Sequence, residues 1–209
     1  MMLYLRAHRA PVGLSASVAL VVLAWWLADQ VIPMPALLHG RAETVPFPLL
    51  FATLFAPVTA HLFGGPALKL EWAARRRLLV PDLVLLVCLL APPLLVAVVA
   101  KLTQQGEFGL ALARNVTLYV GFAVALVALG SQVAAAAVPL GYFLATGTLG
   151  GTVNGSPQWW AVVRWPGEVD TAWIGLAVLL VGFGWFQWRI RRRPRSVASA
   201  APATRLGAP

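Results

Sequence analysis

Six long apolar stretches constrain this chain more than any other feature of its sequence. A helix needs about 20 apolar residues to cross about 30 Å of hydrocarbon, and six stretches reach or approach that length. They run over about Leu14–Met34, Val45–Gly64, Leu78–Ala100, Phe108–Leu129, Ser131–Leu149 and Thr171–Trp188. Because lipid offers the backbone no hydrogen-bond partners, such stretches are stable there as α-helices. We therefore predict an all-α polytopic membrane protein with about six transmembrane helices.

The composition excludes an ordinary soluble domain. Of the 209 residues, 60% are hydrophobic and 11% are charged, whereas soluble domains have about 45–50% apolar and about 25% charged residues. The net charge is +9, and it is gathered in clusters beside the apolar stretches. A nucleic-acid surface would more often spread over a soluble domain. We therefore expect anionic lipid as a partner and no nucleic acid.

Three basic clusters predict the orientation in the membrane. Their members are Arg6 and Arg9; Lys69 with Arg75, Arg76 and Arg77; and Arg189, Arg191, Arg192, Arg193 and Arg195. Cytoplasmic connections carry an excess of Lys and Arg, and an odd number of spans would put one cluster on the wrong side. We predict a multi-pass protein of the cell inner (plasma) membrane with both ends in the cytoplasm. A single transmembrane domain covers residues 1–195, and a disordered cytosolic tail covers 196–209.

One break between predicted spans is short. The run Phe108–Leu149 is too long for one helix and has a single polar interruption at Gly130-Ser131-Gln132. We predict two helices joined by a tight turn there. A single long tilted helix followed by a re-entrant piece is the alternative.

The segment Gly150–Asp170 is long for a connection and half apolar. It includes Trp159, Trp160 and Trp165, and indole rings favour the depth of the lipid headgroups. A segment of this kind can enter the outer leaflet as a re-entrant helical hairpin, and we expect one before the last helix.

Two intramembrane polar residues, Asp82 and Arg114, stand inside predicted spans. A charge at the centre of a span costs about 2.5–3.5 kcal/mol on insertion scales, so it faces protein or water. Asp82 lies about one turn into its span, within reach of the cytosolic interface near Arg77. Arg114 lies about two turns from the outer end and could snorkel. Their depths differ by most of the bilayer, so we do not expect them to pair.

The cytosolic segment from Lys69 to Arg77 has two interpretations. It could be a plain anchor that obeys the positive-inside rule, or a short amphipathic helix that docks a cytosolic partner. Glu71 could pair with Arg75 at helical i,i+4 spacing, which leaves the following arginines for lipid or partner carboxylates. The candidate docking residues are Lys69, Glu71, Trp72, Arg75, Arg76 and Arg77.

The motifs of common enzymes are missing from the sequence. There is no phosphate-binding loop, no His-Glu-x-x-His, no Cys/His cluster and no Gly-x-Ser-x-Gly, so nothing predicts intrinsic ATP hydrolysis or a metal site. We expect no enzyme activity, no metal and no cofactor. An intramembrane enzyme acting on lipid remains an alternative, which would need Asp82, His61 and Arg114 to converge at one depth.

The layout resembles a small, actinobacterial-type membrane subunit of the ABC-2-type transporter permeases. A basic lead-in, Leu3-Tyr-Leu-Arg-Ala-His-Arg9, precedes the first span, and Glu71-Trp-Ala-Ala-Arg-Arg-Arg77 joins the second and third. The resemblance extends to Ala113-Arg-Asn115, to Ala137-Val-Pro139 and to the tryptophan-rich segment before the last span.

The resemblance implies an export permease that works with a separate ATP-binding subunit. It implies a homodimer or heterodimer of membrane subunits, with the segment 69–77 as the coupling helix that meets the ATPase. The alternative is a non-transporting integral membrane protein, such as a scaffold, an immunity protein or an assembly factor.

Overall fold

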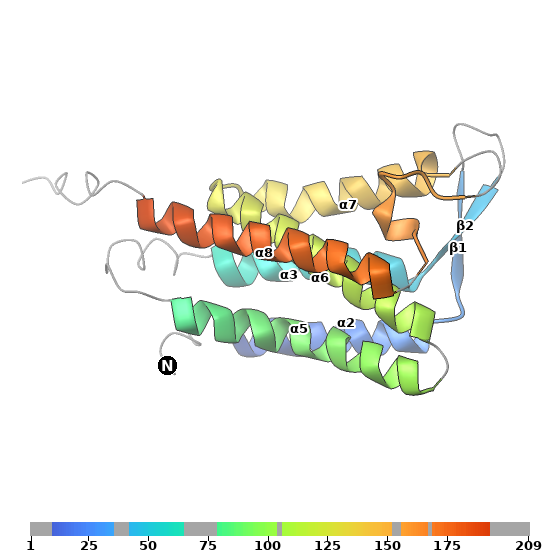
Figure 1. Ribbon diagram of the computed structural model, residues 1–209, viewed down its shortest axis with the longest axis horizontal. Coiled ribbons are helices and arrows are strands. Elements are labelled where there is room, and N and C mark those ends of the chain that lie inside the picture. The colour runs from blue at the N-terminus through green and yellow to red at the C-terminus, as the bar shows by residue number, and fades with distance from the viewer. Residues whose placement is uncertain are drawn as a thin grey trace, which may run out of the picture.

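The computed structural model describes residues 10–35, 42–64, 79–103, 106–151, 156–166 and 169–192. Within these ranges the chain forms six α-helices that run side by side, with a β-hairpin at one end (Figure 1). The helices are α2 (Ala10–Trp26), α3 (Pro48–Gly64), α5 (Leu79–Leu102), α6 (Gly106–Ala128), α7 (Gln132–Leu149) and α8 (Val169–Arg192). The mostly helical fold that the sequence predicts is confirmed.

Four of the described helices are long and apolar enough to cross a membrane. The candidate spans are Leu79–Leu102, Glu107–Ala128, Gln132–Leu149 and Trp173–Ile190. The other two helices, α2 and α3, are apolar but have 17 residues each. Seventeen residues rise about 26 Å as an α-helix, which is slightly less than the about 30 Å of a hydrocarbon core.

A two-stranded hairpin stands where the first predicted span was expected to end. Strands β1 (Val31–Pro35) and β2 (Ala42–Pro46) pair antiparallel, with Ile32 opposite Val45. The predicted span limits at Met34 and Val45 are therefore wrong, because both residues lie in strands. Proline has no backbone N–H and disfavours a helix interior, and Pro33, Pro35 and Pro46 fall within these ten positions.

The predicted break between α6 and α7 is confirmed. Helix α6 ends at Ala128, and Gly130 follows with a φ of 92°, a backbone conformation that glycine adopts without steric cost. Ser131 is the N-cap of α7, and its side chain accepts a hydrogen bond from the backbone N–H of Ala134 at 3.1 Å. The alternative of one long tilted helix is therefore wrong.

Helix α6 is the centre of the bundle. It packs against α8, α3, α5 and α7, and Val116, Tyr119, Val120 and Ala123 on it are fully buried. The outward faces of α5 and α8 are apolar and exposed, for example at Leu95 and Val181. Large exposed apolar surfaces are typical of proteins that face lipid rather than water.

The bundle has two distinct ends (Figure 1). The hairpin β1–β2 and the turn η1 (Val162–Arg164) lie at one end, which we call the hairpin end. Helices α2, α5 and α7 begin, and α3, α6 and α8 end, at the other. We call this the basic end because α8 finishes there in Arg189-Ile190-Arg191-Arg192.

Candidate functional site

Arg114 on α6 is the most highly connected polar side chain that the structure describes. It is 1% exposed, and its guanidinium has five N–H donors. Its Nε donates to Asn115 Oδ1 at 3.1 Å. Its Nη1 donates to the carbonyl of Pro166 at 3.0 Å and to Thr171 Oγ1 at 2.9 Å. Its Nη2 donates to the carbonyls of Val163 at 3.2 Å and Trp165 at 2.9 Å. The number of acceptors therefore equals the number of donors.

These bonds fasten the connection before α8 to the side of α6. Thr171, in the first turn of α8, also donates its hydroxyl to the carbonyl of Pro166 at 3.0 Å. Asn115 adds a second donor to the carbonyl of Val163 at 3.1 Å. Two adjacent side chains of one helix thus fix both the η1 turn and the start of the next helix.

The same connection is also tied to α7. The hydroxyl of Tyr142 donates to the carbonyl of Trp160 at 2.6 Å, and the backbone N–H of Gln158 donates to the carbonyl of Gly150 at 2.7 Å. Within the connection, the indole N–H of Trp165 donates to the carbonyl of Gln158 at 3.0 Å. The described residues 156–166 contain the η1 turn and no helical hairpin, so the predicted re-entrant hairpin is not found there.

The Arg114 cluster is built to hold structure rather than to capture a ligand. Each guanidinium N–H is already matched to an acceptor, and every acceptor is uncharged. Arg114 does not snorkel, since it is buried and the connection folds over it. The side chain supplies donors to three backbone carbonyls, at positions 163, 165 and 166, at the end of a bundle of apolar helices, where buried backbone groups need hydrogen-bond partners.

Asp82 has a separate partner near the basic end. It lies in the first turn of α5 and is 3% exposed. Gln187 of α8 donates from Nε2 to Asp82 Oδ2 at 2.8 Å. Arg114 and Asp82 thus each have their own partners near opposite ends of the bundle, and the structure does not bring them together.

The candidate docking residues lie outside the described residues. Lys69, Glu71, Trp72, Arg75, Arg76 and Arg77 all fall between the end of α3 at Gly64 and the start of α5 at Leu79. The structure does place the two flanking helix ends at the basic end, together with the end of α8 (Figure 1).

Helices α6 and α8 cross at close contact through glycines. A Cβ on Gly182 would collide with the carbonyl oxygen of Gly121, and a Cβ on Gly121 would lie 2.8 Å from Leu179 Cα. A Cβ on Gly175 would collide with Thr117 Oγ1. Small residues allow such close approach of helices in membranes.

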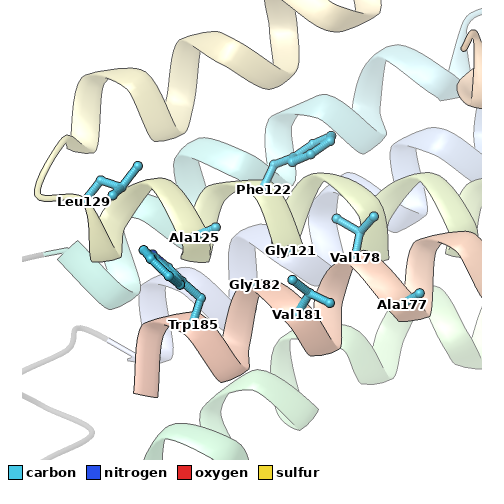
Figure 2. Close-up of a pocket in the computed structure, with 9 residues that line it drawn as sticks. All are labelled: Gly121, Phe122, Ala125, Leu129, Ala177, Val178, Val181, Gly182 and Trp185. Atoms are coloured by element: carbon cyan, nitrogen blue, oxygen red, sulfur yellow. The ribbon is translucent and has the colours of Figure 1, made fainter. Parts of the chain in front are cut away.

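A groove of about 480 Å³ follows this crossing on one side (Figure 2). Its lining comes from α6 and α8 and consists of Gly121, Phe122, Ala125, Leu129, Ala177, Val178, Val181, Gly182 and Trp185. Apart from the indole N–H of Trp185, no side chain in the lining can form a hydrogen bond.

Sequence reasoning missed Asn115, Gln187 and the glycines of the crossing as functional positions. The amide beside Arg114 was a usable signal, because two adjacent polar residues inside an apolar helix need a shared set of partners. Gly175 and Gly182 are seven residues apart, a spacing that returns to the same helix face. Gln187 gave no signal beyond its polarity near a span end.

Among the residues that the structure describes, no group of three or more His, Cys, Asp or Glu side chains could hold a metal ion. The site and the fold thus define a helical bundle with apolar spans and an arginine-centred clamp. Comparison with protein-family models, curated proteins and solved structures finds no match for this chain.

Proposed function

We propose that the chain is the membrane-spanning permease subunit of an ABC-type exporter and that a separate subunit binds and hydrolyses ATP. All six helices cross the inner membrane, and the basic end faces the cytoplasm in accordance with the positive-inside rule. The four longer helices alone would also leave both ends of the chain on one side, since four is an even number of spans.

The observation that carries the proposal is that the helix ends on either side of the basic segment lie at the same end of the bundle as the end of α8. Helix α3 ends at Gly64 and α5 begins at Leu79, both at the basic end, and the sequence between them contains Glu71 and three arginines. Directly after this segment, Asp82 connects α5 to Gln187 of α8. A push on the segment by an ATPase would thus reach α5 and, through this hydrogen bond, α8.

The core of the bundle is filled with apolar side chains, and this limits where a substrate could cross the membrane. The buried serine and threonine hydroxyls in the described residues donate to backbone carbonyls, as in Ser17 to Leu89 and Thr59 to Phe55, and their neighbours are apolar. A path through one copy would need polar groups facing a cavity. A substrate therefore crosses between two membrane subunits, in line with a dimer whose halves move relative to each other.

Co-purification with an ATP-binding protein encoded by a neighbouring gene tests the proposal. Replacement of Arg75, Arg76 and Arg77 by alanine together, and Glu71→Ala separately, should reduce both recovery of the ATPase and its activity in proteoliposomes. The control is Lys101→Ala, which removes an exposed charge at the hairpin end. Unchanged recovery and activity in both docking variants would refute the docking role.

A non-transporting scaffold, immunity or assembly protein is the second candidate. The same closed, apolar core favours it, because such a protein needs no substrate path. Absence of an adjacent ATP-binding gene, together with a stable complex that lacks an ATPase, would favour this candidate over the exporter.

A further inference from the structure

The groove between α6 and α8 has the form of a site for an extended apolar chain (Figure 2). Gly121 and Gly182 form its floor, where the two backbones touch. Leu129 and Trp185 lie near one end of the groove, and Ala177 and Val178 lie near the other. Its volume of about 480 Å³ is within the about 300–1,000 Å³ of pockets that bind small molecules.

The lining decides what kind of molecule can fill this groove. A bound water needs two to four polar partners, and the lining offers only the indole of Trp185. An empty groove would leave the lining atoms without dispersion contacts. In a membrane the groove opens toward hydrocarbon, so an acyl chain is the occupant that its chemistry favours.

A positive charge stands one turn beyond the groove. Val181, Trp185 and Arg189 succeed one another at i,i+4 spacing, so they share a face of α8. The indole of Trp185 stacks on that of Trp188 with ring centroids 4.9 Å apart, and indoles favour the headgroup depth. Arg189 is half-buried, and guanidinium groups pair well with phosphate oxygens.

We propose that the groove binds one acyl chain of an anionic phospholipid and that Arg189 contacts the phosphate of this lipid. The sequence around Arg189 is basic, which favours a headgroup of net negative charge. The inference rests on the membrane embedding proposed above and is independent of the exporter assignment.

Native mass spectrometry of the full-length protein tests the proposal. The protein is purified in mild detergent with equal amounts of phosphatidylglycerol and phosphatidylcholine, and the retained lipids are counted. Ala125→Phe places a ring inside the groove, and we expect it to abolish retention. Arg189→Gln should weaken retention of phosphatidylglycerol about fivefold, since one basic residue near an anionic surface contributes about that factor, and should leave phosphatidylcholine unchanged.

Two control variants separate this effect from general changes of the surface. Ala137→Phe adds the same ring on the exposed face of α7, and Lys101→Gln removes a charge at the hairpin end. Both should retain lipid like the wild type. Should Ala125→Phe fail to fold, Ala177→Phe fills the groove from its exposed rim.

The remaining outcomes overturn the proposal. Equal lipid retention in the groove-filling variants would show that the chain binds elsewhere. If the groove-filling variants lost a dimer that the wild type forms and still retained lipid, the groove would be assigned to a second copy of the protein. Equal retention of both lipids, unaffected by Arg189→Gln, would remove the headgroup contact. Recovery of the protein outside the membrane fraction would instead refute the embedding, and the ATPase assay tests the exporter assignment separately.

Discussion

The guanidinium of Arg114 is charged, yet each group that accepts a hydrogen bond from it is neutral. Three of its acceptors are backbone carbonyls, at positions 163, 165 and 166. The planar fork of arginine directs five donors outward from one group, which suits several carbonyls of one folded segment. A lysine in the same place would offer three donors on a single nitrogen.

Replacement of Arg114 by lysine should therefore destabilise the protein. Lysine has three N–H donors for the five acceptors of Arg114, so at least two hydrogen bonds are lost, and a hydrogen bond to a charged group contributes about 1.5–3 kcal/mol. We expect Arg114→Lys to lower the free energy of unfolding by about 2–5 kcal/mol, measured by denaturant titration in detergent micelles. Lys101→Arg, at an exposed position, is the control and should match the wild type. A stability of Arg114→Lys equal to that of this control would contradict the clamp.

At the scale of elements, the α6–α8 crossing depends on the absence of side chains. Gly182 faces the backbone of Gly121, whereas a Cβ on Gly184, two residues later on α8, would meet nothing within 4 Å. Gly182 and Gly184 thus lie on the same helix and differ in what an added side chain would contact.

This pair gives a matched test of the crossing. Gly182→Ala forces the backbones apart, and overpacking of this kind costs about 1–3 kcal/mol. Gly184→Ala should be neutral or stabilise by up to about 1 kcal/mol, because alanine is the better helix former. Thermal unfolding of both variants in the same detergent measures the difference. Equal melting temperatures would show that α6 and α8 are not in close contact.

The sequence predicts the described helices better than the contacts between them. Helices α5, α6 and α7 begin and end within about two residues of the predicted limits, since their apolar runs are long and their flanks polar. The sequence did not predict the hairpin because Val31, Ile32 and Val45 are apolar residues that fit a strand as well as a helix. The acceptors of Arg114 were missed because backbone carbonyls 49 to 52 residues away have no signature in side-chain identity.

For the whole molecule, the two ends of the bundle should lie on opposite sides of the membrane. In a Cys88→Ala background, which removes the single native cysteine, new cysteines report on each end. Ser156→Cys is exposed at the hairpin end, and Gln132→Cys is exposed at the start of α7 near the basic end. An impermeant maleimide should label Ser156→Cys in spheroplasts, and Gln132→Cys only after the membrane is opened. The reverse pattern would invert the proposed orientation.

The prolines of the hairpin have a consequence for how neighbouring copies meet. The backbone N–H of Phe47 donates to the carbonyl of Gln30 at 2.8 Å, and alternate pairs of an antiparallel ladder turn their donors outward. Given the register, Pro33, Pro35 and Pro46 occupy such outward places and have no N–H to offer. The edge of β1 that faces away from β2 therefore presents a single backbone N–H donor, that of Val31. Two neighbouring molecules in one membrane therefore cannot pair their hairpins edge to edge through β1 to form a shared sheet.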